Sequence, residues 1–180
     1  MMNKKANVML ILLFFVILFV ILFLGFIMAI GSSVLNFVFD ETMPELTSLG
    51  QTENINLSST AKLVLNPVDN VVQSLTWLTG VLYMIMLIGS VGIVFIVRGS
   101  PSKWLLGLYF GLAIILILGA MLMSNMYEEF YDSTDDLALR MKEHTLLSNM
   151  LLYSPAILTV IVFITGIILF SGLGTEQEII

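Results

Sequence analysis

Cysteine is absent from this 180-residue chain, and histidine occurs only once, at His144. The absence of cysteine excludes disulfide bonds, thiolate nucleophiles and cysteine-ligated iron–sulfur or zinc sites. A single histidine also provides too few donors for the usual zinc, copper or haem sites within one chain. We therefore expect no cofactor, no metal site and no catalytic residues, and we expect that the protein is not an enzyme.

Charged residues are also scarce, at 11% of the chain, whereas hydrophobic residues make up 58% and the mean hydropathy is +1.03. A typical soluble domain carries about 25% charged residues. The composition therefore predicts a protein whose main solvent is the lipid bilayer. Because most of its length is apolar, we treat residues 1–180 as a single membrane domain. The net charge of −6 gives no indication of nucleic-acid binding.

Four apolar runs are each long enough to cross about 30 Å of hydrocarbon at roughly 1.5 Å per residue. They lie at about 8–30, 75–97, 104–124 and 150–170. The first run follows a short basic start and resembles a signal peptide, but it is longer than the usual hydrophobic segment of such a peptide, which favours a retained anchor. The predicted fold is therefore all-α, an integral membrane bundle of four transmembrane helices.

Lysine and arginine near the ends of the runs predict the orientation, because positive residues are retained in the cytoplasm. Two lysines precede the first run, and Arg98 and Lys103 lie between the second and the third. The other two connections, 31–74 and 125–149, are rich in Asp and Glu. We therefore expect both termini in the cytoplasm and two acidic outer loops, in the membrane of a cell or of a virus.

A loose internal duplication follows the first and third runs. Residues 39–46 (FDETMPEL) and 130–137 (FYDSTDDL) both fit the pattern Phe-x-acid-hydroxyl-x-x-acid-Leu. The same offset superposes the first run on the third, so the pattern favours two helix–loop–helix hairpins in the same orientation, a parallel repeat. Chance similarity is the alternative for segments this short.

The two outer loops differ in pattern. Apolar residues in 137–147 recur at helical spacing, which predicts a short amphipathic helix at the membrane interface after the third span. In the first loop, the Asn-Pro pair at 66–67 predicts a break before the second run. An N-glycosylation sequon begins at Asn56, on the expected outer side.

Carboxylates after the third run could hold Ca²⁺ through their oxygens. Their spacing lacks the alternating acids and the glycine of an EF-hand loop, so a solvated acidic stretch is the favoured interpretation. His144 is expected at the surface or at the interface. Methionines in the second and third runs are interpreted as apolar filling rather than as Cu(I) ligands, because no Cys or His accompanies them. The carboxylates are those of Glu128, Glu129, Asp132, Asp135 and Asp136.

Charged residues are missing from all four runs. Pumps, ion-coupled carriers and voltage sensors bury such groups within the membrane, so these functions are disfavoured. Small residues occur instead at helix-packing spacing. We interpret them as contacts within the chain rather than as an oligomer interface. The pairs are Gly25 with Ala29, Gly89 with Gly92, and Gly107 with Gly111.

These features favour a non-catalytic structural or accessory subunit of a larger membrane complex, packed through its helices and exposing an acidic outer surface. The alternative is a homo-oligomeric, holin-like pore whose acidic vestibule attracts cations, although the runs show little of the polar stripe that a pore requires. An enzyme that acts on lipid is a third hypothesis, which no pair of catalytic groups supports. The expected partners are the lipid bilayer and other membrane subunits, and no nucleic acid.

Overall fold

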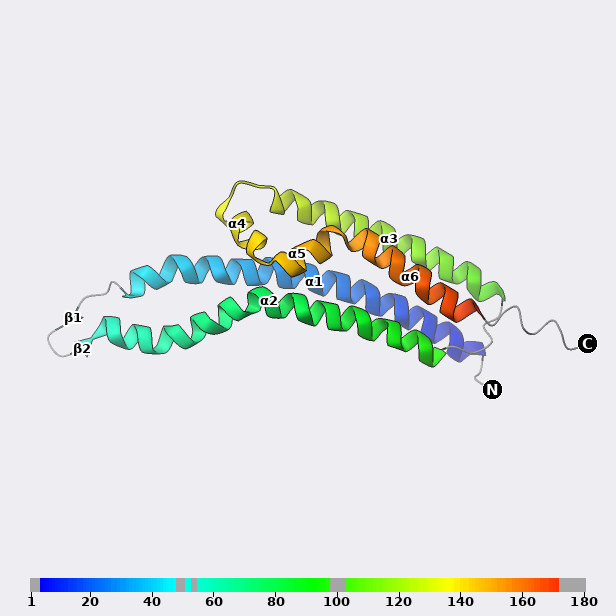
Figure 1. Ribbon diagram of the computed structural model, residues 1–180, viewed down its shortest axis with the longest axis horizontal. Coiled ribbons are helices and arrows are strands. Elements are labelled where there is room, and N and C mark those ends of the chain that lie inside the picture. Colours follow the sequence, from blue (N-terminus) through cyan, green and yellow to red (C-terminus); the bar gives the residue numbers. More distant parts are fainter. Residues whose placement is uncertain (1–3, 48–50, 53–54, 98–102, 172–180) are drawn as a thin grey trace, which may run out of the picture.

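The computed structural model describes residues 4–47, 51–52, 55–97 and 103–171. Four long helices lie side by side along the long axis of the molecule (Figure 1). They are α1 (Lys4–Thr47), α2 (Leu57–Val97), α3 (Lys103–Tyr131) and α6 (Ser154–Phe170). Two short helices, α4 (Asp136–Glu143) and α5 (Thr145–Leu152), connect α3 to α6. The paired β1 (Gln51–Thr52) and β2 (Ile55–Asn56) lie between α1 and α2.

The prediction of a helical bundle is confirmed. Three helices are long and apolar enough to cross a membrane, over Val8–Thr42, Asn66–Gly92 and Trp104–Tyr131, and there are up to four if α5 and α6 form one broken span. The four-span topology and the orientation stay predictions. The basic turn at 98–102 and the tail at 172–180, which bear on that orientation, lie outside the described residues.

The first hairpin is much longer than its apolar runs, because α1 has 44 residues and α2 has 41. Its far end extends beyond α3 and α6 (Figure 1). Residues 31–47 and 57–74 are therefore helical where a loop is expected, and their outer position stays a prediction. Polar residues after Ile30 are accommodated in the helix, since the hydroxyls of Ser32 and Ser33 donate to the carbonyls of Met28 and Ala29 at 2.6 and 2.7 Å.

The break predicted at the Asn-Pro pair is also wrong, because α2 continues through Pro67. A proline removes one backbone N–H and crowds the preceding turn, but a helix that is held by its neighbours tolerates this. Helix α2 lies along α1 for most of its length (Figure 1). The helix continues through this segment although Asn66, Pro67 and Val68 are exposed, so the local turn signal does not decide the structure here.

The fourth apolar run is not one straight helix. Helices α5 and α6 meet at Tyr153 with a bend of 70°, so the run expected as one helix from about residue 150 is broken, and its longer part begins at Ser154. Pro155 lies in the first turn of α6, where its missing N–H leaves no helical bond unmade. The hydroxyl of Ser124 on α3 donates to the carbonyl of Leu152 at 2.6 Å, which satisfies an acceptor at the end of α5.

The two halves of the proposed duplication have different structures. Residues 39–46 are entirely within α1, whereas residues 130–137 form the end of α3, a turn and the start of α4. The second segment therefore turns back toward the bundle where the first continues away from it (Figure 1). The local structure gives no support to a repeat of these eight-residue segments.

Helix α1 lies at the centre of the core, in contact with α2, α3, α4 and α5. Tyr109 on α3 is buried and donates to the carbonyl of Val162 on α6 at 2.7 Å, and its hydroxyl also lies 2.8 Å from Thr165 Oγ1. The fully buried apolar side chains of the core include Leu18, Leu22, Leu105, Leu116, Met141, Leu147, Leu151 and Leu158.

Four glycines allow helices to approach closely. A Cβ at Gly25 would lie 2.4 Å from Tyr83 Cε2 on α2, and Cβ atoms at Gly80, Gly119 and Gly166 would lie 2.9, 2.9 and 3.2 Å from side chains of other helices. Ala29 is also completely buried. Intrachain packing is therefore confirmed for the Gly25–Ala29 pair.

Candidate functional site

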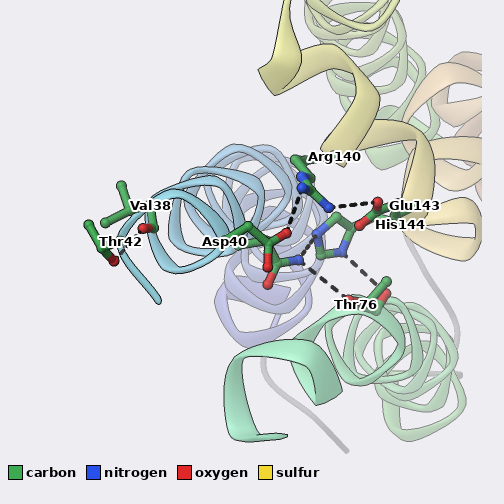
Figure 2. A network of polar contacts seen from close by, with 8 residues as sticks. Val38, Asp40, Thr42, Thr76, Arg140, Glu143 and His144 are labelled. Atoms are coloured by element: carbon green, nitrogen blue, oxygen red, sulfur yellow. Dashed lines mark hydrogen bonds and ion pairs between the residues drawn. The ribbon is translucent and has the colours of Figure 1, made fainter. Parts of the chain in front are cut away.

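A polar cluster lies where the junction of α4 and α5 contacts α1 and α2 (Figure 2). His144 occupies that junction and is 0% exposed, so the expectation of a surface histidine is wrong. The cause is the amphipathic pattern of α4, which buries Ala138 and Met141 against the bundle. Because the chain turns immediately after Glu143, this burial brings the imidazole between α1 and α2.

Both ring nitrogens of His144 have partners. Nδ1 lies 3.2 Å from the carbonyl oxygen of Thr76, and since a carbonyl only accepts, Nδ1 carries the proton and donates. In the neutral ring, Nε2 then accepts from Asn36 Nδ2 at 3.4 Å. The same amide nitrogen donates to Thr76 Oγ1 at 3.5 Å. His144 thus connects α1 to α2, and its geometry suits a structural role.

The oxygen of the Asn36 amide is unsatisfied. Asn36 is 6% exposed, and its Oδ1 has no hydrogen-bond partner among the described residues. Since Nδ2 faces Thr76 and His144, Oδ1 points away from both. A buried acceptor without a partner costs about 1–3 kcal/mol, and among the described residues Ser154 Oγ is the other buried polar side-chain atom in this state.

Arg140 forms two ion pairs next to this cluster. Its guanidinium lies 2.6 Å from Asp40 Oδ2 on α1 and 3.0 Å from Glu143 Oε1 on α4 (Figure 2). The side chains of Arg140 and Asp40 are 31% and 41% exposed, so each pair is worth roughly 0–1 kcal/mol. The pair with Asp40 joins α4 to α1, whereas the pair with Glu143 lies within α4.

Two further hydroxyls fix α5 to α3 and α4. Ser148 Oγ donates to the Met141 carbonyl at 2.7 Å, so the Tyr127 hydroxyl, 2.7 Å away, donates to Ser148 Oγ. All three residues are buried. The segment from α4 to α5 is therefore held on the bundle by hydrogen bonds on two sides of the His144 junction.

Burial lowers the pKa of His144 from its ordinary value of 6.5, because the charged imidazolium loses hydration. The hydrogen bond to Thr76 and the nearby carboxylate of Glu143 oppose this effect but do not reverse it. Arg140 and Asp40 are the other charged groups of the cluster (Figure 2). The ring is therefore neutral in the folded chain near neutral pH.

Acidification is expected to destabilise the fold in a window that begins at about pH 6.5 and extends downward to the lowered pKa of His144. In that window the unfolded chain binds a proton that the folded chain does not, so the free energy of unfolding falls as the pH falls. We expect a lower midpoint of thermal unfolding at pH 5.5 than at pH 7.5. His144→Gln removes the only histidine; an equal pH slope in that variant would contradict the assignment.

Two cavities adjoin at Arg140, between the end of the bundle and the long hairpin. The larger has a volume of about 630 Å³ and the smaller about 330 Å³, and both are lined by Asp40, Arg140 and Glu143. The larger cavity is also lined by Phe37, Glu41, Asp136 and Leu139. The smaller is also lined by Asn36, Phe39, Val72, Gln73 and Thr76. Four carboxylates and one guanidinium therefore line this region, which gives it a negative potential.

No protein-family model, curated protein or solved structure matches this chain.

The acidic residues that the sequence offered as Ca²⁺ ligands are distributed rather than gathered. Glu128 and Glu129 are exposed on the last turns of α3, and Asp132 is exposed in the turn that follows. Within the described ranges, no three Asp, Glu, His or Cys side chains are close enough to hold a metal ion. Asp136 alone of this group lines the larger cavity.

Sequence reasoning missed Asn36, Asp40 and Arg140 as members of one site. Asn36 was hidden in a segment expected to be a loop, and Asp40 was noted only as part of the duplication. One signal is available: Arg140 and Lys142 are the two basic residues of a connection with six carboxylates, so a carboxylate partner for the arginine is expected nearby. The side chains of residues 51–62, which include the sequon asparagine, are outside what the structure describes.

Proposed function

We propose that the protein is a non-catalytic structural or accessory subunit of a larger membrane complex. Helices α1, α2 and α3 and the bent α5–α6 pair cross the bilayer, with both termini in the cytoplasm. The acidic region around Arg140 then faces outward. The chain packs against its partners through lipid-facing helix surfaces, and it supplies no reacting group.

The observation that carries this proposal is a set of glycines that no side chain covers within the part of the chain that the structure describes. Cβ atoms at Gly107 and Gly111 on α3, and at Gly89 and Gly92 on α2, would meet nothing within 4 Å among the described residues. All four residues are exposed. The interpretation of these pairs as contacts within the chain is therefore wrong, unlike that of the Gly25–Ala29 pair.

An uncovered glycine pair on an apolar helix is suited to a second helix. In lipid, helices associate through close van der Waals packing, and glycines four positions apart permit it. The face of α3 around the pair is otherwise built of large side chains, including Phe110, Ile114 and Leu118. Such a surface supports docking of a transmembrane helix from another subunit.

The test is the composition of the complex after mild extraction from the cell that makes it. We expect stoichiometric foreign subunits with the wild-type chain, identified by mass spectrometry. The double variant Gly107→Leu, Gly111→Leu adds side chains on the docking face and is expected to reduce copurification at least about tenfold, since each 1.4 kcal/mol of lost packing is a factor of ten.

Gly31→Leu is the matched control. Gly31 is exposed, and a Cβ at this position would meet no described residue within 4 Å, but its neighbours four positions away are the large residues Ile27 and Leu35. The control should retain the partners. Wild-type chain that purifies alone would overturn the proposal, and a clean homo-oligomer would replace it with the pore hypothesis, for which conductance across a planar bilayer is the next measurement.

A further inference from the structure

The far end of the α1–α2 hairpin carries a motif that the proposed function does not use. Asn56, Leu57 and Ser58 form the only Asn-x-Ser/Thr sequence of the 180 residues, and its middle residue is not proline. An asparagine in this sequence accepts an N-linked glycan where it lies on the surface of the side that is glycosylated. Three residues match such a pattern easily by chance, so the place of the motif in the fold decides its meaning.

The backbone places this motif where β2 meets α2. Asn56 is the last residue of β2 and pairs with Gln51 of β1, and Leu57 is the first residue of α2. The β1–β2 pair lies at the end of the hairpin, beyond the ends of α3, α4, α5 and α6 (Figure 1). A connection at the end of a projection is open to an enzyme from several sides, whereas a segment within the bundle is not.

The hairpin also carries the motif away from the lipid. Residues 31–47 of α1 extend about 25 Å past the end of the first apolar run, at roughly 1.5 Å per residue. The headgroup layer takes up about 5–8 Å of this length. The motif therefore lies in the aqueous phase in the orientation proposed above, clear of the headgroups. Its surroundings are polar, since Ile55 and Leu57 are the only hydrophobic residues in 51–60.

We propose that Asn56 is a site of N-linked glycosylation on the outer side of the membrane. The donor is an oligosaccharide joined through its anomeric carbon to a polyprenyl phosphate carrier, and the cell supplies both the donor and the transferase. Nδ2 of Asn56 forms a bond to the anomeric carbon and loses one proton. The bond between that carbon and the phosphate oxygen breaks, and the lipid phosphate leaves with the electron pair, so nothing is oxidised or reduced.

The first experiment synthesises the full chain in the presence of endoplasmic-reticulum membranes that are competent for glycosylation. We expect most of the inserted chain to gain the mass of one glycan on a denaturing gel and to lose it on treatment with an endoglycosidase. The variant Asn56→Gln should gain none, because the acceptor amide is then absent from the motif. An inserted wild-type chain without a glycan would overturn the proposal.

Neighbouring substitutions separate recognition of the motif from damage to the fold. Ser58→Ala should abolish the modification, whereas Ser59→Ala makes the same change one residue outside the motif and should retain it. Leu57→Pro should also abolish it, since proline in the middle position blocks the motif. The fold tolerates this proline, because Leu57 is the first residue of α2 and follows an extended residue. A glycan retained in Leu57→Pro, or lost equally in the two serine variants, would contradict the assignment.

A second experiment examines the chain from the cells that make it. Intact-mass spectrometry of the purified chain should give a mass above the 20.0 kDa of the sequence, with the excess equal to one glycan. Asn56→Gln, expressed in the same cells, should lack the excess. A wild-type chain with the mass of its sequence alone would show that these cells do not modify Asn56 and would overturn the proposal.

This site rests on the outward orientation in the proposed function, and two further variants test that orientation separately. In the Asn56→Gln background, Asp132→Asn places a sequon at 132–134, in the exposed turn after α3, and Arg98→Asn places one at 98–100, between the second and third apolar runs. We expect a glycan on the first variant and none on the second. A glycan on the Asp132→Asn variant but none on the wild-type chain would overturn the Asn56 site alone, whereas a glycan on the Arg98→Asn variant would overturn the orientation.

Discussion

Gly25→Ala is expected to destabilise the fold by about 1–3 kcal/mol, the usual cost of overfilling a packed core. The new methyl group would lie 2.4 Å from Tyr83 Cε2 and 2.7 Å from Cδ2, far inside van der Waals contact. Tyr83 is 1% exposed, so its ring has no solvent to move into. Helices α1 and α2 must therefore separate locally, and the loss is measured by reversible unfolding of the purified chain in mixed detergent micelles.

Gly31→Ala provides the comparison in the same helix. A Cβ at Gly31 meets nothing within 4 Å, and alanine is favoured over glycine in a helix by about 0.4–1 kcal/mol. The two variants make the same chemical change six residues apart and are expected to have effects of opposite sign. Equal effects would contradict the packing of α1 on α2.

His144→Leu is the second large effect, with an expected loss of about 2–4 kcal/mol. The substitution removes hydrogen bonds to Thr76 and Asn36, each worth about 0.5–1.5 kcal/mol, and it leaves buried polar groups beside an apolar side chain. The same unfolding assay measures it. Amide hydrogen exchange should locate the damage in residues 136–152, because this histidine holds the α4–α5 segment against α1 and α2.

Thr145→Ala is the control for that variant. Thr145 is the next residue in the chain, but it is exposed, and its hydroxyl donates a long hydrogen bond, 3.5 Å, to the Lys142 carbonyl. Substitutions at such positions usually change stability by less than about 0.5 kcal/mol. If His144→Leu lowered the free energy of unfolding by an equally small amount, the imidazole would not stabilise the packing of the α4–α5 segment on the bundle.

The helices themselves could be predicted from the sequence because each depends on local composition. Runs of Leu, Ile, Val and Phe longer than a membrane thickness admit few structures other than a helix, and the helical fold follows. Whether a helix ends where its apolar run ends depends on contacts with other helices. Residues 31–47 contain Ser, Asn, Asp and Pro, which locally favour turns, yet contacts with α2 and α4 keep them helical.

The break at Tyr153 illustrates the opposite error. The apolar run continues across this residue, so composition alone predicts one helix from about 150 to 170. At the bend, the carbonyl of Leu152 accepts a hydrogen bond from the Ser124 hydroxyl on another helix, a contact that composition does not reveal. A proline in the adjacent turn was the only local signal.

The candidate site could not be predicted because its members are far apart in the chain. Asn36 and Thr76 are 40 positions apart, and Asn36 and His144 are 108 apart. No periodicity relates residues at such distances. Burial of a lone histidine is a tertiary property, since it depends on which face of α4 meets the bundle, and the polar surroundings of His144 made a solvent-exposed position the ordinary expectation.

The length of the α1–α2 hairpin has an electrostatic consequence. In the proposed orientation, residues 31–47 rise about 25 Å past the hydrocarbon boundary, at roughly 1.5 Å per residue. Even after the headgroup layer of about 5–8 Å, the tip lies beyond the Debye length of about 8 Å at physiological salt. A protein bound at that end of the hairpin is therefore insensitive to whether the lipids beneath are anionic or neutral. The carboxylates around Arg140 lie close to the headgroups, so the electrostatic potential of the lipid surface acts on them directly.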